Sequence, residues 1–302
     1  MQTADIIRQD IIKLDTEIIV NAANRYLQAG GGVCGAIFSA AGEKQLQEAC
    51  DQIGGCETGS AVITPGFRLC RYIIHAVGPV WKGGKNNEAE QLYRCYIRSL
   101  DLARECDCHS IGFPLISSGI YGFPGRGAWR QAAKAISDWA KENPDYDLRI
   151  VFAVLDADRM HEGKEIFSEY APNVFMVRKK DWQNSEMSKR NEHFEIPVTI
   201  PEKKLDILRH GHLPQGMEDK WFWYMEGDVL HAHRSWTGYC IYIADFSEKG
   251  KIKVTVNRDP EQYTCTDIEE DKEKFCDLLS RWADIPYDHY SQWLHETAEA
   301  LK

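Results

Sequence analysis

The chain has 302 residues, of which 43% are hydrophobic and 27% charged, a length that suggests about two domains. Its formal net charge is -10, from 46 acidic and 36 basic residues. This balance argues against a surface that binds bulk DNA or RNA, because phosphate binding needs clustered lysine and arginine. A small anion pocket built from backbone N–H groups stays compatible with it.

Neither a secretory signal nor a membrane span is expected. Charged residues interrupt every apolar stretch near the N-terminus, and no run of about 18 apolar residues occurs anywhere. The ten cysteines are scattered and include no Cys-x-x-Cys pair. We therefore expect reduced thiols and a cytoplasmic location, and neither disulfides nor a zinc site.

Strand and helix patterns alternate over residues 1 to about 175. Strands are expected at 17–21, 72–77, 110–114 and 149–155, and amphipathic helices at 33–53, 92–102 and 129–140. Apolar strands separated by helices are typical of a mostly parallel sheet that is covered on both faces. The first domain is therefore expected to be α/β and to span residues 1–175.

The remaining chain has a different character. Residues 176–194 are polar and aperiodic and are expected to form a linker. A smaller α+β domain is expected at 195–302, because aromatic and β-branched runs at 221–226 and 229–243 flank a Gly-Asp turn. Helical patterns follow at 267–279 and 288–301.

Two glycine-containing loops are the most informative segments. Residues 21–37 and 115–125 each follow an expected strand and precede an expected helix. Glycines let the backbone approach a ligand, and a helix N-terminus offers free N–H groups to an anion. At the carboxyl ends of parallel strands the two loops would face each other and could hold a diphosphate. A tight strand–helix turn is the simpler reading of the first loop.

Five motifs in order along residues 1–172 resemble the macrodomain, the ADP-ribose-binding module. They are Gln9-Asp10-Ile11, Ile19-Val20-Asn21-Ala22-Ala23-Asn24, Gly30-Gly31-Gly32-Val33, His75-Ala76-Val77-Gly78-Pro79-Val80-Trp81 and Ser117-Ser118-Gly119-Ile120-Tyr121-Gly122-Phe123-Pro124. The chain looks most like the branch of O-acetyl-ADP-ribose deacetylases and mono-ADP-ribosyl hydrolases. The resemblance implies a three-layer α/β/α sandwich with a mixed, mainly parallel sheet. It implies ADP-ribose or an ADP-ribosylated substrate as partner, and no cofactor or metal is expected.

The resemblance also implies roles for individual residues. Asp10 and Ile11 would meet adenine, although Asp10 could instead be a surface turn carboxylate. Asn24 would bind the distal ribose, and Leu155 stands where the family often places an aromatic residue beside adenine. The two loops would contribute Gly31, Gly32, Val33 and Cys34 from the first, and Ser117, Ser118, Gly119, Ile120, Tyr121, Gly122 and Phe123 from the second.

One departure bears on catalysis. The hydrolytic branch typically has Asp directly after Gly-Gly-Val and His four residues later, where this chain has Cys34 and Phe38. A carboxylate can act as a general base near neutral pH, whereas a free thiol with a pKa of about 8.5 cannot replace it directly. The helix N-terminus could lower the pKa of Cys34 and make it reactive, or Cys34 could only fill the position. Asn24 and Cys34 are thus the candidate catalytic residues.

Two functions remain open from the sequence. The first is an enzyme that binds ADP-ribosyl conjugates and hydrolyses an ADP-ribosyl or O-acetyl-ADP-ribose linkage. The alternative is a non-catalytic ADP-ribose reader, whose C-terminal domain binds a partner or carries separate chemistry. Cys34 bears on the choice between these functions, because it stands where the hydrolytic branch typically has a catalytic Asp.

Histidines and tryptophans supply the remaining candidates. His75 lies in a strand pattern and is expected to be a hydrogen-bonded core residue. His231 and His233 share one face of an expected strand, and His210 and His212 repeat that spacing, which would suit a metal but lacks further ligands. Arg234 with the tryptophans at 221, 223 and 236 could form a cationic aromatic surface, or simply a core.

Overall fold

The computed structural model describes residues 2–214 and 216–283 and divides the chain into two compact units, Met1–Phe175 and Met176–Lys302. The helix expected at 288–301 lies outside the described residues. No helix within the described ranges is both long and apolar enough to cross a membrane.

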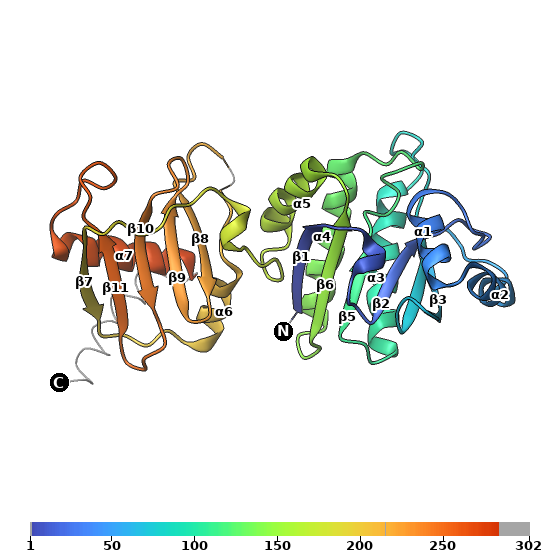
Figure 1. Ribbon diagram of the computed structural model, residues 1–302, viewed down its shortest axis with the longest axis horizontal. Coiled ribbons are helices and arrows are strands. Elements are labelled where there is room, and N and C mark those ends of the chain that lie inside the picture. The colour runs from blue at the N-terminus through green and yellow to red at the C-terminus, as the bar shows by residue number, and fades with distance from the viewer. Residues whose placement is uncertain (1, 215, 284–302) are drawn as a thin grey trace. The chain divides into compact units, whose positions relative to one another are not determined.

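The first unit is built on a six-stranded sheet of order β1-β6-β5-β2-β4-β3 (Figure 1). Its strands are β1 (Gln2–Arg8), β2 (Ile18–Ala22), β3 (Ser60–Pro65), β4 (Tyr72–Val77), β5 (Ser110–Phe113) and β6 (Leu148–Val154). Only β3 runs antiparallel to its neighbour, so the expected mixed, mainly parallel sheet is confirmed. The sequence patterns missed β1 and β3, the two edge strands, because both mix polar and apolar residues.

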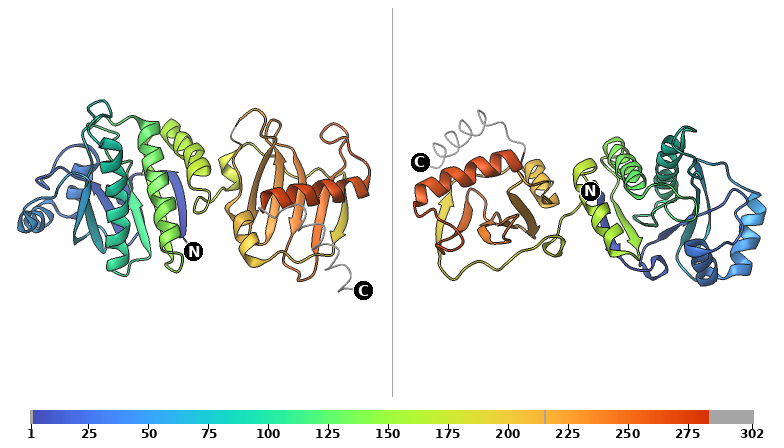
Figure 2. Two further views of the ribbon diagram at one scale, coloured as in Figure 1. Left: turned by 180° about the vertical axis from the view of Figure 1, so that it is seen from behind. Right: turned by 90° about the horizontal axis from the view of Figure 1, so that it is seen from above.

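Helices cover both faces of this sheet, which gives the three layers that the sequence predicted. On one face lie α1 (Gly32–Ala41) and α2 (Glu43–Ile53), which pack with the short helix η1 (Ile11–Lys13) on β2 and β4. The other face carries α3 (Glu88–Glu105), α4 (Gly125–Glu142) and α5 (Ala157–Tyr170), seen from behind in Figure 2.

The single helix expected at 33–53 is two helices. Gly42 separates them with a φ of 109°, a conformation that favours glycine and cannot continue an α-helix. The apolar spacing on either side is helical, so periodicity alone did not reveal the break. This break lets α1 start directly at the glycine loop and end after three turns.

The second unit is an antiparallel five-stranded sheet of order β7-β11-β10-β9-β8 with helices packed on one face. Its strands are β7 (Asn191–Ile196), β8 (Trp221–Glu226), β9 (Val229–Arg234), β10 (Cys240–Asp245) and β11 (Ile252–Asn257), and its helices are α6 (Glu202–His210) and α7 (Ile268–Trp282). An α+β domain was expected here. The run at 229–243 proved to be two strands, since residues 235–239 turn the chain between β9 and β10.

The structure groups residues 176–194, expected as a linker, with the second unit. The N–H of Val177 donates to the His210 carbonyl at 2.7 Å, and Trp182 Nε1 donates to the Ser235 carbonyl at 2.8 Å. The N–H of Ser185 donates to the Gly238 carbonyl at 2.9 Å. Hydrogen bonds between this segment and the backbone of distant residues leave no periodic pattern in the sequence. The segment was therefore expected to be a linker.

Candidate functional site

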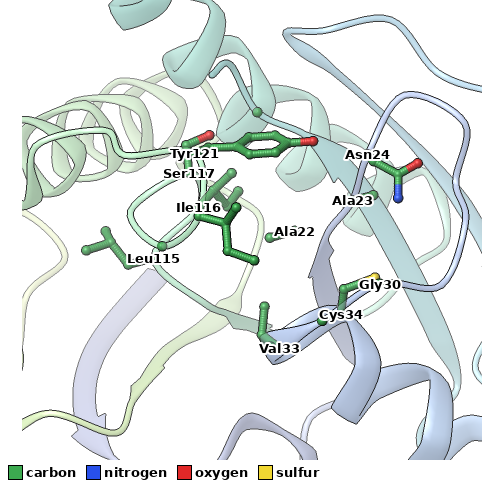
Figure 3. Close-up of a pocket in the computed structure, with 15 residues that line it drawn as sticks. Ala22, Ala23, Asn24, Gly30, Val33, Cys34, Leu115, Ile116, Ser117 and Tyr121 are labelled. Carbon is green, nitrogen blue, oxygen red and sulfur yellow. The ribbon is translucent and has the colours of Figure 1, made fainter. Parts of the chain in front are cut away.

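The two glycine-containing loops line one pocket of about 280 Å³ in the first unit (Figure 3). One loop connects β2 to α1 and the other connects β5 to α4. Strands β2 and β5 pair in parallel, so their carboxyl ends, and hence both loops, lie at the same edge of the sheet. Of the predicted site residues, the lining contains Asn24, Gly31, Gly32, Val33, Cys34, Ser117, Gly119, Ile120 and Tyr121.

Asn24 stabilises the first loop from within. Its Oδ1 accepts hydrogen bonds from the N–H of Tyr26 at 3.1 Å and of Gln28 at 3.2 Å, and its Nδ2 donates to the Gln28 carbonyl at 2.6 Å. Figure 3 shows the Tyr121 hydroxyl directed across the pocket toward Asn24. Asn24 thus lines the pocket, and its side chain stabilises the conformation of residues 24–28.

The second loop presents uncommitted N–H groups. Within the described chain, the N–H groups of Gly119, Ile120 and Tyr121 donate to no protein atom, whereas the Gly122 N–H donates to the Gly119 carbonyl at 2.9 Å. Ser117 starts the loop with a left-handed φ of 63°, and its buried Oγ has no hydrogen-bond partner. Successive free N–H groups in a turn form a concavity that suits an anion.

Gly78 is a pocket residue that the sequence analysis did not single out. A Cβ built on Gly78 would lie 2.2 Å from Ser117 Oγ, so any side chain there would displace the second loop. Ala22, Ala23, Gly30, Leu115 and Ile116 also line the pocket. Each of these residues lies inside or beside a quoted motif, and that adjacency was the available signal.

Asp10, Ile11 and Leu155 lie outside this pocket, on the neighbouring strand ends. Asp10 accepts a hydrogen bond from the Ile12 N–H at 3.3 Å and so caps η1, and Ile11 is buried under α1. Leu155 directly follows β6 and is 72% exposed. Since β6 pairs in parallel with β1, these three residues, which we call the shelf, lie at one edge of the sheet and outside the pocket lining.

Three residues of the second loop also lie outside the lining. Ser118 Oγ donates to the Leu115 carbonyl at 2.8 Å. Phe123 is buried, and the centroid of its ring lies 4.6 Å from that of the Trp81 ring. The backbone N–H of Trp81 donates to the Tyr121 carbonyl at 2.8 Å. Gly122 adopts a left-handed φ of 69° that turns the chain toward Phe123. These residues stabilise the conformation of the second loop without lining the pocket.

Cys34 is a buried, hydrogen-bonded thiol. Its Sγ accepts a hydrogen bond from Asn21 Nδ2 at 3.6 Å and donates to the Gln28 carbonyl at 3.9 Å. Burial raises the pKa of the Cys34 thiol, and the hydrogen bonds that oppose this effect do not overcome it. The geometry therefore supports the reading in which Cys34 fills the position. Among the described residues that line the pocket, none is Asp, Glu or His.

Cys34 is expected to react slowly with alkylating reagents. Only the thiolate reacts, and each unit of raised pKa lowers its fraction about tenfold. We expect iodoacetamide at pH 8 to label Cys34 at least about 10-fold more slowly than half-buried Cys106, as followed by mass spectrometry of the two peptides. Equal or faster labelling of Cys34 would indicate an activated thiolate.

His75 is a core histidine beneath the first loop. Its Nδ1 accepts from Asn21 Nδ2 at 3.2 Å, and its Nε2 lies 3.0 Å from Thr64 Oγ1. An amide nitrogen can only donate, so Nε2 carries the proton toward Thr64. Burial lowers the pKa of His75 from 6.5 to about 4. The residue is therefore neutral at physiological pH and links β4 to the loop through Asn21.

The neutrality of His75 predicts a loss of stability in acid. The folded pKa is depressed, so the unfolded chain alone takes up a proton as the pH falls from 6.5 toward 4. The advantage in unfolding free energy of the wild type over His75→Gln should shrink by about 3 kcal/mol between pH 7 and pH 4. Hydrogen exchange of the β4 amides measures this locally. A pH-independent difference would show that the pKa of His75 is the same in the folded and the unfolded chain.

Comparison with known proteins assigns the first unit to a family. The family model described as Macro domain matches residues 20–135. A macro domain-containing protein of Ralstonia nicotianae is 48% identical over 156 residues, which cover 51% of this chain and 88% of the relative. A second, from Listeria monocytogenes, is 46% identical over 160 residues, covering 51% and 91%. The chain belongs to the macro domain family.

Solved macro domains have the same fold as the first unit. The Oceanobacillus iheyensis macrodomain with ADP superposes with a TM-score of 0.51 and 38% identity, covering 54% of this chain and 89% of that one. A mutant of it with ADPR gives a TM-score of 0.51 and 36% identity, covering 54% and 91%. The Trypanosoma brucei macrodomain in complex with ADP gives 0.50 and 34%, covering 53% and 67%.

His210, His212, His231 and His233, the pairs considered for a metal, do not converge on one site. His231 stacks on Tyr224 with the ring centroids 4.9 Å apart. His233 is buried, and its Nδ1 lies 3.1 Å from the Gly238 carbonyl oxygen. His210 Nδ1 lies 2.6 Å from the Asp206 carbonyl, and His212 Nε2 lies 2.5 Å from Asp219 Oδ2. No three His, Cys, Asp or Glu side chains in residues 2–214 and 216–283 are placed to hold a metal ion.

Proposed function

We propose that residues 1–175 bind ADP-ribose, either free or as the terminal group of an ADP-ribosylated molecule. The observation that carries this proposal is the pocket between two loops, one with three adjacent free N–H groups and the other entering the N-terminus of α1. Backbone donors and a helix N-terminus suit a diphosphate and need no lysine, in keeping with an acidic protein. Related macro domains have been solved with ADP and with ADPR.

The pocket is large enough for only part of ADP-ribose, so the remainder would lie outside it. A cavity of about 280 Å³ is at the lower end of the range for small-molecule sites, and it suits part of a dinucleotide-like ligand. The diphosphate and distal ribose would occupy the pocket, with the ribose near Asn24. Adenine would then lie on the shelf of Asp10, Ile11 and Leu155. Leu155 offers aliphatic contact in place of aromatic stacking.

We favour binding without hydrolysis. Water attack at the ribose needs a general base, and the described lining holds no carboxylate or imidazole. The Cys34 thiol is buried, its pKa is raised, and its Sγ is engaged by Asn21 and Gln28. The unit would therefore act as a reader of ADP-ribosyl groups and leave the linkage intact.

A turnover assay separates the reader from the hydrolase. The full-length chain is incubated with mono-ADP-ribosylated protein and, separately, with O-acetyl-ADP-ribose, and released ADP-ribose is followed by mass spectrometry. The reader proposal predicts retention of the conjugate with no release above the buffer rate. Release by the wild-type chain that disappears when Gly119→Glu places a carboxylate in the pocket would establish hydrolysis instead.

A further inference from the structure

A second cavity, of about 540 Å³, lies at one end of the sheet in the second unit. It is formed by the segment before β8, the turn between β9 and β10, and the turn after β11. Five of its lining residues are charged or offer an exposed aromatic ring: Glu218, Lys220, Arg234, Trp236 and Glu261. All belong to the second unit, so the cavity is separate from the macro domain pocket.

The Arg234 guanidinium is stacked on an aromatic ring, and its N–H groups form no hydrogen bond with the described residues. Its guanidinium carbon lies 4.3 Å from the centroid of the Trp221 ring, the cross-strand partner of Arg234 on β8. Among the described residues, neither Arg234 nor Lys220 forms a side-chain hydrogen bond or ion pair. A guanidinium stacked on an aromatic ring presents its N–H groups in a fixed plane, which suits the oxygens of a phosphate.

Trp236 offers a fixed and open ring surface beside these cations. The residue is 61% exposed, and its Nε1 donates to the Met217 carbonyl at 3.2 Å. The turn beneath it is anchored by Ser235 Oγ, which donates to the Asp219 carbonyl at 2.7 Å. An exposed indole that is already ordered loses little entropy when a flat ring stacks on it.

Two carboxylates complete the cavity. Glu218 and Glu261 line it together with Arg234 and Lys220, and their side chains pair with no cation of the described chain. The four charges cancel, so the cavity suits a ligand that carries both an anion and N–H donors. A long nucleic acid strand would be opposed by these carboxylates and by the net charge of -10.

We propose that this cavity binds a free nucleotide whose base has an exocyclic amine, such as AMP. The phosphate would meet Arg234 and Lys220, the base would stack on Trp236, and the amine would donate to Glu218 or Glu261. This site is additional to the ADP-ribose pocket and would stand if that proposal failed.

The test is a calorimetric titration of the full-length chain carrying Gly119→Glu, which places a carboxylate in the macro domain pocket. AMP should bind at one site, and UMP, which lacks the amine, should bind at least about 10-fold more weakly. Arg234→Met and Trp236→Ala, made in the same background, should each weaken AMP binding at least about 10-fold. Lys249→Met, at an exposed turn at the other end of the sheet, is the matched control and should change nothing.

Several results would overturn the proposal. They are a lack of saturable AMP binding, equal binding of AMP and UMP, or AMP binding that survives both Arg234→Met and Trp236→Ala. Circular dichroism checks the fold of each variant, and Arg234→Lys, which keeps the charge and loses the planar fork, serves if Arg234→Met does not fold. Tighter, strongly salt-dependent binding of a short oligoadenylate would also overturn it, in favour of a nucleic-acid site.

Discussion

Gly119→Glu is expected to weaken ADP-ribose binding to the macro domain by at least about 100-fold, because it places a carboxylate where the diphosphate would lie. Gly119 lies between Ser118 and Ile120 in the second loop and lines the pocket. A Cβ built there meets nothing within 4 Å, and the residue is not among the glycines with a left-handed φ. The substitution should therefore leave the fold intact and change only the charge that meets the ligand.

Gln52→Glu is the matched control for this prediction. It adds the same negative charge at an exposed position near the end of α2, and it should leave the affinity within about 2-fold. Calorimetry with ADP-ribose measures both variants. If Gly119→Glu bound as tightly as Gln52→Glu, the diphosphate would not lie against the second loop.

Asp271→Asn is expected to destabilise the second unit by about 3 kcal/mol, since it leaves the largely buried Arg258 with only the half-exposed Glu192 as charge partner. Asp271 lies in the first turns of α7 and is fully buried. Its Oδ2 accepts from Arg258 Nη1 at 2.5 Å, and its Oδ1 accepts from the hydroxyls of Tyr242 at 2.8 Å and Tyr263 at 2.5 Å. The carboxylate thus ties α7 to β10 and to the segment after β11.

The pH dependence follows from the same contacts. Burial alone would raise the pKa of Asp271, but hydrogen bonds from Tyr263, Arg258 and Tyr242 outweigh burial and lower it. The stabilisation is therefore complete above the ordinary aspartate pKa and is lost as the pH falls through the lower, folded value.

Chemical denaturation at pH 7 measures the effect, with Glu270→Gln as control. Glu270 lies one residue away in an exposed pair with Lys274, and its loss should cost less than about 1 kcal/mol. Equal losses for the two variants would mean that the buried network contributes no more than a surface ion pair.

The strands that bracket the macro domain pocket could be predicted from the sequence. Residues 17–21, 72–77, 110–114 and 149–155 are mainly apolar runs, and each corresponds to a largely buried strand of the sheet. The glycine loops follow such strands directly, so their place at the carboxyl edge of the sheet also followed from the pattern.

Other features depend on contacts between distant residues. Whether Cys34 is reactive depends on Asn21 and Gln28, which surround its sulfur only after the loop has folded. The need for glycine at Gly78 arises from Ser117, 39 positions along the chain, whose Oγ would lie 2.2 Å from a Cβ there. Residues 177–185 have no periodicity because their bonds go to the backbone of other segments. Local sequence patterns do not predict contacts between residues that are far apart in the chain.

The most direct test of the proposed function is a calorimetric titration of ADP-ribose into the full-length wild-type chain, repeated with Gly119→Glu and with Arg234→Met. A binding macro domain predicts saturable binding at about 10 µM or tighter, lost in Gly119→Glu and kept in Arg234→Met. An absence of saturable binding, or binding that survives Gly119→Glu and disappears in Arg234→Met, would contradict an ADP-ribose site between the two loops.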